Sequence, residues 1–473
     1  MAANRSRHPR RTRREFLAWC GITAPLGALT LTACRAAAAP ASPVVATPEP
    51  AVPTATAAGP TPSPSADPRP QATATQPAGA TPSVAAASPT AAAATRTSGT
   101  PNYLRTDGTK IVDAARREVT LTGLSWFGME TGTLAPHGLW VRSYGSMLDQ
   151  IVQAGYNCLR LPFSNALFDP AFQPNGIDFN QNPDLQGKSG LQIMDTIVVA
   201  AGQRGLKVFL DQHRPNKDQQ SALWYTDHLP QDVWIAQWRA LAARYRGNDA
   251  VIGADLHNEP AGPCTWGSGD AQTDWAMAAT ACGNAILEAN PNWLILVEGI
   301  EKIVDQSGNP LDWTWQGGEL MNAGKHPIQL SVPDRVIYSP HDYGPGVYDQ
   351  HWFSDPTFPD NLPGFWDQHW GYLQKQGIGP VLVGEFGGRS VGTDTEGTWQ
   401  RTLVSYLKAN QLHYTYWCLN PDSGDTGGLL EDDWQTLNVD KQTLLKTYQG
   451  QSFENGTPDV VNLSAVPEAH ATT

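Results

Sequence analysis

Eight short apolar segments recur between residues 119 and 419, and this recurrence limits the possible folds more than any other feature of the chain. Their Val, Ile and Leu content is typical of strands that are buried on both faces of a parallel sheet. Stretches between them, such as 191–203 and 232–245, place apolar residues at helical spacing. Strands and helices that alternate eight times predict an α/β fold, the (β/α)8 TIM barrel. The predicted strands are 119–128, 156–162, 206–213, 251–258, 293–298, 335–342, 381–385 and 413–419.

A doubly wound open sheet is the alternative fold for such a pattern. That fold would be expected to carry a glycine-rich phosphate-binding loop after an early strand. The sequence contains no such loop, so we favour the barrel.

Two of the predicted strands end in a glutamate. The segment 251–260 (VIGADLHNEP) turns from apolar to polar and brings Asn258 and Glu259 before Pro260, which stops the strand. The segment 379–388 (GPVLVGEFGG) ends in a similar way, with Glu385 followed by glycines. A solvated turn is the alternative for either strand end taken alone. In a barrel, however, the carboxyl ends of all strands meet on one face, and two carboxylates that face each other there can cleave a glycosidic bond.

Other strand ends carry further polar and aromatic side chains. Four of these ends supply candidates for binding a ligand: Arg160, His213, His341 with Tyr343, and Trp417. A single histidine or arginine at a strand end is usually structural, so only the joint placement of these residues favours a binding site.

The ordered set of strand-end residues resembles glycoside hydrolase family 5, the cellulase family. The set consists of Arg160, the His213–Arg214 pair, the Asn258–Glu259–Pro260 run, His341 with Tyr343, Glu385, and Trp417. Longer runs resemble the bacterial endo-β-1,4-glucanases of that family: HGLWVRSYGSMLDQI (137–151), QSALWYT (220–226), WFSDPTFPDNLPG (352–364) and NPDSGDTGG (420–428). The likeness covers residues 103–448.

The resemblance implies a retaining endo-β-1,4-glucanase that cleaves internal bonds of cellulose or related β-glucans. A β-mannanase, xyloglucanase or mixed-linkage glucanase of the same family is the alternative within this class. A lipid-anchored sugar-binding protein without catalytic activity is the alternative from another class, but such a protein would have no use for two facing glutamates.

The resemblance also implies a role for each residue of the set. Glu259 would be the acid/base and Glu385 the nucleophile. We expect Arg160 and Tyr343 to favour the ionised form of Glu385, and the charge of Glu385 to raise the pKa of Glu259. For the others, Asn258 would bind the sugar 2-hydroxyl, His213 and His341 would bind other hydroxyls or the nucleophile, and Trp417 would lie beneath the cleaved sugar.

Tryptophan is abundant in the predicted domain, which holds all 17 tryptophans of the chain except Trp19. Flat indole rings stack on the apolar faces of sugars. We expect Trp126 to bind substrate in this way, whereas Trp234 and Trp238, at helical spacing, are predicted to be core. Platforms and core packing remain equal alternatives for Trp266, Trp315, Tyr348 and Trp352.

The first 100 residues are predicted to export and tether the folded domain. Arg13 and Arg14 form a twin-arginine pattern ahead of a short apolar stretch, and the LTAC run that ends at Cys34 resembles a lipobox. We therefore expect lipidation of Cys34, at the outer face of a bacterial cell membrane, or secretion. Residues 35–99 are rich in Ala, Pro, Thr and Ser, as in a disordered linker. The predicted divisions are a signal peptide (1–33), a linker (34–100), a catalytic domain (101–452) and a disordered tail (453–473).

The cysteines of the predicted domain fall into two groups. Cys158 and Cys418 lie in apolar strand patterns and are predicted to be buried free thiols. Cys264 follows the strand that ends in Glu259, and Cys282 lies in the next predicted helix. In an oxidising compartment we predict a disulfide between them.

The formal net charge of −13 limits the possible partners. Such an acidic chain excludes nucleic acid or an anionic membrane surface as the main partner. We expect a monomer that binds β-glucan oligo- or polysaccharides and contacts the membrane only through its lipid anchor. The sequence has no His/Cys cluster of the kind that holds a catalytic metal, and we expect neither a metal nor a cofactor.

Overall fold

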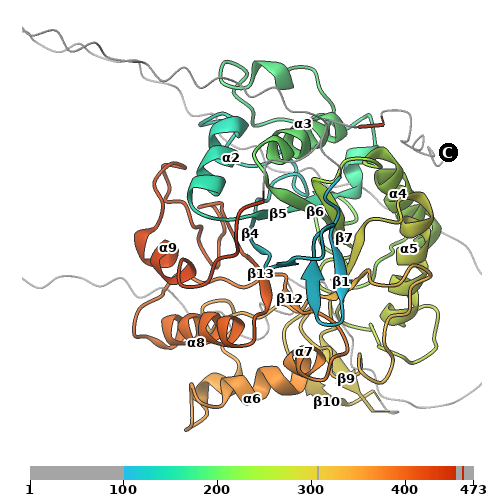
Figure 1. Cartoon of the computed structure of the whole chain (residues 1–473), viewed down its shortest axis with the longest axis vertical. Coiled ribbons are helices and arrows are strands. Elements are labelled where there is room, and N and C mark those ends of the chain that lie inside the picture. Colours follow the sequence, from blue (N-terminus) through green and yellow to red (C-terminus); the bar gives the residue numbers. More distant parts are fainter. Residues whose placement is uncertain (1–100, 306–307, 454–460, 463–473) are drawn as a thin grey trace, which may run out of the picture. The chain divides into compact units, whose positions relative to one another are not determined.

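The eight predicted strands form one parallel sheet in the computed structural model of the chain, which describes residues 101–305, 308–453 and 461–462 (Figure 1). Each strand lies inside its predicted bounds or extends at most two residues beyond them. The strands are β4 (Thr122–Ser125), β5 (Cys158–Ser164), β6 (Lys207–Arg214), β7 (Val251–Asp255), β8 (Leu294–Val297), β11 (Val336–Tyr338), β12 (Leu382–Val383) and β13 (His413–Tyr416).

The sheet closes into a barrel. Its strand order is β11-β8-β7-β6-β5-β4-β13-β12, and every neighbouring pair is parallel. The first and last strands meet through parallel bridges between Tyr338 and Val381 and between His341 and Glu385. The Tyr338 amide donates to the Pro380 carbonyl at 3.1 Å, which continues the hydrogen-bond ladder across this seam. The predicted (β/α)8 barrel is therefore confirmed.

Helices surround the barrel between successive strands, as Figure 1 shows. They are α2 (Tyr144–Gln153), α3 (Gly190–Gln203), α4 (Gln231–Arg244), α5 (Trp275–Ala289), α6 (Leu362–Trp366), α7 (Tyr372–Lys375), α8 (Thr395–Ala409) and α9 (Val439–Leu445). A π-helical segment, Asp367–Gly371, joins α6 to α7, and short 3₁₀ helices cover Asn165–Phe168, Pro183–Leu185 and His351–Ser354. None of the described helices is long and apolar enough to cross a membrane.

One connection departs from the alternation of strand and helix. Between β8 and β11 the described residues form an antiparallel hairpin, β9 (Lys302–Val304) and β10 (Pro310–Trp313), in place of a helix. This hairpin is followed by the turn residues that lead to β11.

The start of α3 illustrates how local sequence fixes an element. Ser189 accepts a hydrogen bond from the Gln192 amide, and the Gln192 side chain accepts one from the Ser189 amide at 2.9 Å. This reciprocal capping box satisfies backbone donors that the first helical turn leaves free. The helix therefore begins at Gly190, one residue before the predicted start.

Residues of each strand alternate between two hydrophobic clusters. On β5, Leu159 packs with the surrounding helices while its neighbour Cys158 points into the barrel. The same alternation places Val208 outside and Phe209 inside on β6, as expected for a strand with a period of two. Both faces of the sheet are thus buried, which explains why the strands are apolar throughout.

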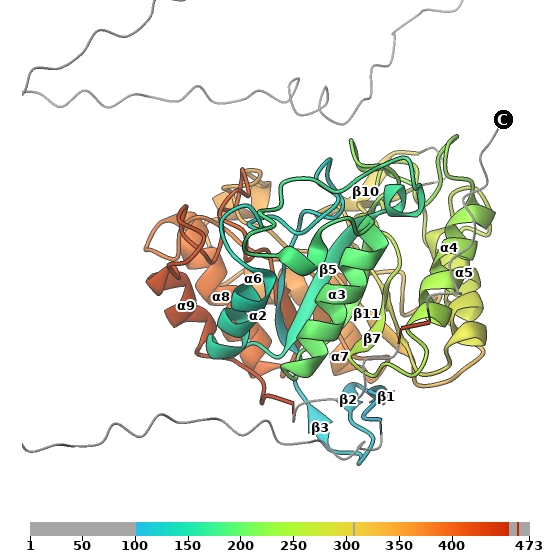
Figure 2. The same ribbon diagram turned by 90° about the horizontal axis from the view of Figure 1, so that it is seen from above.

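A small antiparallel sheet seals the amino-terminal end of the barrel. It is formed by β1 (Arg105–Asp107), β2 (Lys110–Val112) and β3 (Glu118–Val119), and Figure 2 shows it at one end of the barrel. We call the cluster there the apolar end: Leu104, Ile111, Leu121, Cys158, Phe209, Ile252, Leu294, Leu296, Ile337 and Leu382.

The cysteine predictions are half right. Cys158 and Cys418 are buried free thiols, as predicted. Cys264 and Cys282 are also free, so the predicted disulfide between them is wrong. The Cys264 thiol donates to the Ala222 carbonyl at 3.1 Å, whereas the Cys282 side chain packs on the buried face of α5.

The predicted signal peptide, lipobox and linker lie outside the described residues, as does most of the predicted tail. The few tail residues that are described contact the domain. Phe453 packs against the apolar end, and the Asn462 amide donates to the Arg244 carbonyl at 2.7 Å.

Candidate active site

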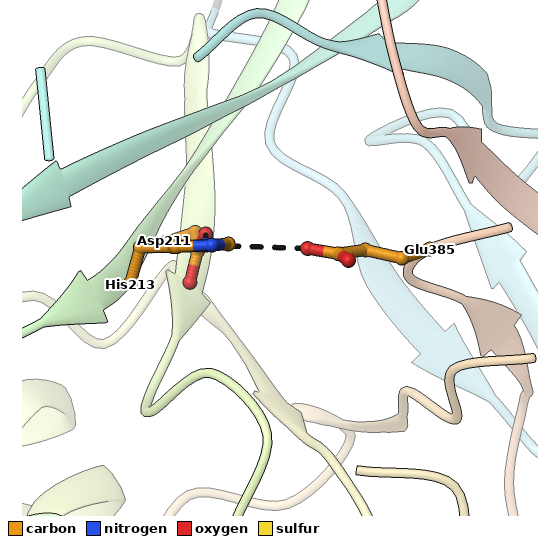
Figure 3. A group of neighbouring side chains, drawn as sticks. All are labelled: Asp211, His213 and Glu385. Atoms are coloured by element: carbon orange, nitrogen blue, oxygen red, sulfur yellow. Dashed lines mark hydrogen bonds and ion pairs between the residues drawn. The ribbon is translucent and has the colours of Figure 1, made fainter. Parts of the chain in front are cut away.

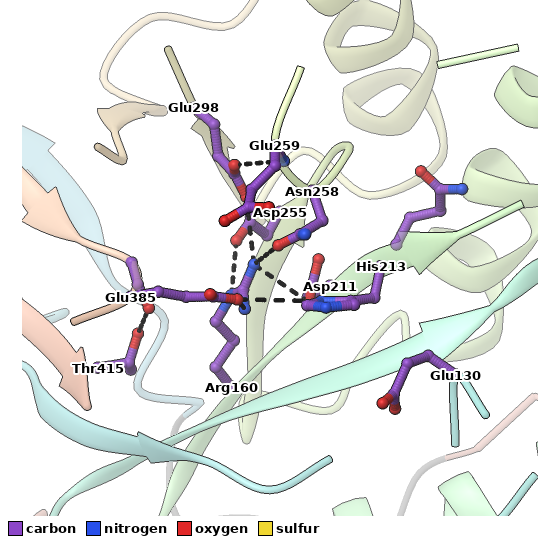
Figure 4. Close-up of polar contacts among 12 residues, drawn as sticks. Glu130, Arg160, Asp211, His213, Asp255, Asn258, Glu259, Glu298, Glu385 and Thr415 are labelled. Carbon is purple, nitrogen blue, oxygen red and sulfur yellow. Dashed lines mark hydrogen bonds and ion pairs between the residues drawn. The ribbon is translucent and has the colours of Figure 1, made fainter. Parts of the chain in front are cut away.

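Arg160 is the centre of a buried network of carboxylates at the carboxyl-terminal end of the barrel. Its side chain projects from β5 into the barrel and is fully buried. Figure 4 shows the acidic side chains around it, which we call the charged end of the barrel. The contacts of the guanidinium are with Asp255 (2.8 Å), Asp211 (3.1 Å), Glu298 (3.1 Å), Glu385 and the side-chain oxygen of Asn258 (2.8 Å).

Glu385 follows β12 and is held by two strong donors. Arg160 Nη1 donates to its Oε1, and the Tyr343 hydroxyl donates to its Oε2 at 2.5 Å. The structure thus brings Arg160 and Tyr343 to the carboxylate that the sequence singled out. The Glu385 side chain is almost fully buried, with 4% of its surface exposed. Charge-assisted hydrogen bonds of this kind favour an ionised carboxylate.

Glu259 follows β7 and has an unusual backbone conformation. Its φ is +55°, in the left-handed region that side chains other than glycine seldom adopt. The Glu259 amide donates to Glu298 Oε2 at 2.7 Å, which holds the turn in place. A side chain at Gly317 would lie 2.6 Å from the same Glu298 oxygen and 3.4 Å from the Glu259 Cα. Glycine at 317 therefore allows its loop to pack directly against Glu259.

Glu298 is a site residue that the sequence reasoning missed. It follows β8, is fully buried, and contacts Arg160, the Glu259 amide and His341 Nε2, the last at 3.3 Å. Its position at a strand end was visible in the sequence. The signal that could have found it was the same one that found Glu259 and Glu385.

The two glutamates face each other across His341. His341 Nδ1 lies 3.3 Å from Glu259 Oε1 and 3.6 Å from Glu385 Oε2, and an oxygen of one carboxylate lies within 4.8 Å of an oxygen of the other. Retaining glycosidases have carboxyl groups about 5 to 5.5 Å apart, whereas inverting enzymes need about 6.5 to 9.5 Å to admit a water. The separation here is that of a retaining pair.

The expected direction of the Glu259 pKa is wrong. Burial acts to raise this pKa, but the hydrogen bond and charge of His341 and a hydrogen bond from Gln220 (3.0 Å) lower it below its usual value. The pKa of His341 rises well above its usual value, because the surrounding carboxylates, Glu298 first, outweigh burial. The prediction missed the lowered pKa of Glu259 because it considered only the charge of Glu385 and not the contact with His341.

His213 is arranged as a neutral side chain that faces the nucleophile. Its Nδ1 lies 2.7 Å from Asp211 Oδ2 and 4.0 Å from Glu385 Oε1, as Figure 3 shows. Burial lowers the pKa of His213 to about 4 and raises that of Asp211 to about 6. The half-buried Trp417 ring stacks on the His213 ring, with centroids 5.2 Å apart and planes 9° from parallel.

Asn258 is fixed by its neighbours. Its side-chain oxygen accepts a hydrogen bond from Arg160, and its backbone amide donates to the Gln212 carbonyl at 3.0 Å. Because the oxygen is engaged, the side-chain nitrogen is the group of Asn258 that can donate to a ligand.

Trp126 is not part of a binding surface. It is fully buried in the core, and its indole N–H donates to the His137 carbonyl at 2.9 Å. The prediction that Trp126 binds substrate is therefore wrong. Trp266, Trp315 and Trp352 are also buried, and Trp234 and Trp238 are core as predicted. Among the described residues, the more exposed tryptophans are Trp140 and Trp313, which the sequence reasoning did not select.

Four groups of described residues bring three potential metal ligands within 4.8 Å of one another. Three of these groups belong to the charged end, where Arg160 or His341 already lies between the carboxylates. A cation is thus supplied there by the protein itself. The fourth group, which consists of Asp312, Glu319 and His369, lies outside the charged end.

A closed parallel barrel with two glutamates facing each other at its carboxyl-terminal end defines a glycoside hydrolase of the retaining type. Residues 112–423 match the family model for cellulase, glycosyl hydrolase family 5. The chain belongs to this family.

Individual relatives support the assignment. An endoglucanase of Paenibacillus polymyxa is 55% identical over 344 residues, which cover 72% of this chain and 86% of the relative. The major extracellular endoglucanase of Xanthomonas campestris pv. campestris is 40% identical over 360 residues, covering 76% and 73%. The solved structure of a hyperthermophilic endocellulase from the archaeon Pyrococcus horikoshii superposes with a TM-score of 0.69 at 40% identity, covering 74% of this chain and 98% of that one.

Proposed function

We propose that this protein is a retaining endo-β-1,4-glucanase, with Glu259 as acid/base and Glu385 as nucleophile. The observation that carries the proposal is the approach of the two carboxylates to within 4.8 Å at the carboxyl-terminal end of the barrel. The endoglucanase activity named for its relatives supports the choice of β-1,4-glucan as substrate.

In the first step, a Glu385 oxygen attacks the anomeric carbon while Glu259 delivers a proton to the leaving oxygen. The glycosidic C–O bond breaks and a glycosyl ester with Glu385 forms. In the second step, Glu259 removes a proton from water, and the water oxygen displaces Glu385 from the anomeric carbon. Two displacements on opposite faces retain the configuration.

His341 supplies the proton that the first step requires. The lowered pKa of Glu259 and the raised pKa of His341 place this proton on His341 in the free enzyme, 3.3 Å from Glu259 Oε1. A bound glucan excludes water, which makes the charged forms of Glu259 and His341 less favourable. The proton therefore moves from His341 to Glu259 and then to the leaving oxygen.

The names of the relatives favour a glucan over a mannan. Two relatives named as endoglucanases are 55% and 40% identical to this chain, whereas a relative named as a mannan endo-1,4-beta-mannosidase is 24% identical. Hydrolysis of carboxymethylcellulose should therefore exceed that of mannan, and a parallel assay on xyloglucan tests the remaining alternative.

The first test replaces each glutamate by glutamine. E259Q and E385Q should each lower the rate of carboxymethylcellulose hydrolysis by about 10⁴-fold, because one proton carrier or the nucleophile is lost while the size of the side chain is kept. E288Q, on the exposed face of α5, is the matched control and should retain full activity. Activity near normal in E259Q or E385Q would refute the roles proposed here.

Azide distinguishes the two roles, because this small anion fits the space of a deleted carboxylate. With an aryl β-cellobioside, azide should attack the glycosyl-enzyme of E259A and give a β-glycosyl azide. In E385A it should replace the nucleophile and give the α-glycosyl azide. Nuclear magnetic resonance of the products tells the two anomers apart, and the reverse assignment would exchange them.

We also propose that residues 1–33 are a signal peptide, that Cys34 carries a lipid, and that residues 34–100 link this anchor to a catalytic domain at 101–452. The extracellular location named for the Xanthomonas relative supports export. C34A should move the enzyme from the membrane fraction of the producing cells to the medium. An unchanged distribution would contradict lipid anchoring and leave the catalytic proposal untouched.

A further inference from the structure

A second cluster of acidic and histidine side chains lies outside the active site. Asp312 is in β10, Glu319 lies in the turn that follows the β9–β10 hairpin, and His369 is in the π-helical segment Asp367–Gly371. His369 Nε2 lies 3.4 Å from Asp312 Oδ2 and 3.5 Å from Glu319 Oε2, and one ligand atom of each residue lies within 4.8 Å of the others. The cluster thus joins two segments that are 50 residues apart.

Two polar atoms of this cluster are buried without a hydrogen bond. Glu319 and His369 are 1% and 2% exposed, and neither Glu319 Oε2 nor His369 Nε2 has a hydrogen-bond partner. Nearly all buried polar atoms in folded proteins have such a partner, and a bound water or ion is one way in which an exception is satisfied. The two unpartnered atoms lie 3.5 Å from each other.

The other atoms of these side chains are already engaged. His369 Nδ1 lies 2.7 Å from the Phe365 carbonyl, so it carries the ring proton and leaves a lone pair on Nε2. Glu319 Oε1 accepts a hydrogen bond from the Met321 amide at 2.7 Å, which turns Oε2 towards His369. A histidine whose second nitrogen donates to a carbonyl is the arrangement that orients imidazole ligands of metals.

No arginine or lysine among the described residues forms an ion pair with Asp312 or Glu319. The charged end of the barrel differs in this respect, because Arg160 lies between its carboxylates. Burial, together with the nearby charge of Asp312, raises the pKa of Glu319 to about 8, because no described basic side chain offsets the charge of this carboxylate. A bound cation would compensate this charge.

We propose that Asp312, Glu319 and His369 bind a divalent metal ion, and that their chemistry selects zinc. One imidazole nitrogen and two carboxylate oxygens are ligands that zinc accepts, with a water as the fourth. Two ligands that each lie about 2.1 Å from a tetrahedral centre are about 3.4 Å apart. This edge matches the two measured separations, whereas a calcium site would need more oxygen ligands.

The ion would fasten the β9–β10 hairpin to the helical segment between β11 and β12. Asp312, whose side chain is 30% exposed, provides access from solvent, and Gln368 holds its Oδ2 at 3.0 Å. The hairpin also carries the exposed Trp313, whose ring lies 6.0 Å from that of Trp352. We therefore assign the ion a structural role, separate from the chemistry at Glu259 and Glu385.

Metal analysis and thermal unfolding of the full chain test the proposal. After treatment with a chelator and dialysis, one equivalent of Zn²⁺ should bind, and a 100-fold excess over the dissociation constant should raise the Tm by about 4 °C. Mg²⁺ at the same concentration should leave the Tm unchanged. H369Q and E319Q should lose both the bound zinc and the rise in Tm, whereas H228Q, which removes an exposed histidine, should keep both.

Cobalt provides a readout that requires no variant. Co²⁺ bound to the chelated wild-type chain should give the intense visible bands of a tetrahedral site, and Zn²⁺ should abolish them. The absence of these bands, or zinc binding that H369Q leaves intact, would overturn the proposal. The cluster would then be an ion pair in which a protonated His369 lies between two carboxylates.

Discussion

The two ends of the barrel interior bury side chains of opposite kinds, although the same strands supply both. On β6, Phe209 belongs to the apolar end and Asp211, two residues later, to the charged end. Leu296 in β8 and Glu298, directly after β8, differ in the same way. Side chains two residues apart on a strand point to the same face of the sheet. The next inward-facing residue on a strand can therefore lie in the charged end while its predecessor lies in the apolar end.

The difference between the two ends explains how a barrel can hold buried charges in fixed positions. The apolar end gains free energy from burial and closes the strands around one another. The charged end loses free energy through desolvation, which the contacts of Arg160 and His341 offset in part. Substitutions at the charged end should therefore change activity and stability together, whereas those at the apolar end should change stability alone.

Among substitutions that compare the two ends, R160Q should have the largest combined effect on stability and activity. This change leaves Asp211, Asp255 and Glu298 without their shared cation and Glu385 without a donor. We expect a loss of about 3 to 5 kcal/mol in the free energy of unfolding and a fall of about 10²- to 10³-fold in kcat. Urea unfolding and hydrolysis of carboxymethylcellulose measure the two.

R239Q is the control for this change, because the exposed pair of Arg239 and Glu288, at 3.6 Å, should contribute little. An R160Q protein that is as stable as wild type would show that the carboxylates of the charged end do not depend on their cation.

F209A tests the apolar end of the barrel. The removed ring leaves a cavity at the apolar end, and we expect a loss of about 3 to 5 kcal/mol in the free energy of unfolding. The kcat of the folded fraction should stay within about twofold of wild type, because no group of the active site is touched. F172A removes a ring that is 39% exposed and should leave unfolding nearly unchanged. A large fall in kcat of folded F209A would show that the two ends are coupled.

Much of this arrangement could be predicted from the sequence because it follows from the strands alone. Eight apolar segments gave the barrel, and parallel strands bring their carboxyl ends to one face whatever the details of the helices. Glu259 and Glu385 could therefore be placed opposite each other from positions more than 120 residues apart. The resemblance to the cellulase family added the expectation that Arg160 and Tyr343 lie beside Glu385.

The rest depends on contacts that strand positions do not determine. Trp126 immediately follows β4, yet its ring turns into the core, and nothing in the local pattern distinguishes it from Trp417. The lowered pKa of Glu259 needs the position of His341. The free thiols of Cys264 and Cys282 and the cluster around His369 depend on how loops and helices pack outside the barrel.

A pair of tryptophan variants tests the distinction between core and site. W126F removes a buried N–H donor and some core volume, so we expect a loss of about 1 to 3 kcal/mol in the free energy of unfolding with kcat/KM unchanged. W417A removes the half-buried ring next to His213, and we expect kcat/KM on cello-oligosaccharides to fall about tenfold, with a smaller change in stability. A tenfold fall in kcat/KM for W126F, with kcat/KM unchanged for W417A, would show that Trp126 binds substrate.

The smallest effects concern pH, and the two ends should differ in sign. At the charged end, burial raises the pKa of Asp211 to about 6, so the folded state holds this proton more tightly than the unfolded state. Its contribution to stability is greatest below the unfolded pKa and is lost as the pH rises through 6. Beside the apolar end, burial lowers the pKa of His413 in β13 to about 4, and its Nδ1 accepts a hydrogen bond from the amide of Leu121, which belongs to that end. Its contribution is lost as the pH falls towards 4.

Free energies of unfolding measured between pH 4 and 6 should separate these contributions. Each group changes the slope by at most about 1.4 kcal/mol per pH unit, with opposite signs. D211N should make stability rise more steeply with pH than in wild type, because a falling term is removed. H413Q should flatten the same curve. If both variants shift the slope in one direction, the electrostatic difference between the two ends is not what their buried groups indicate.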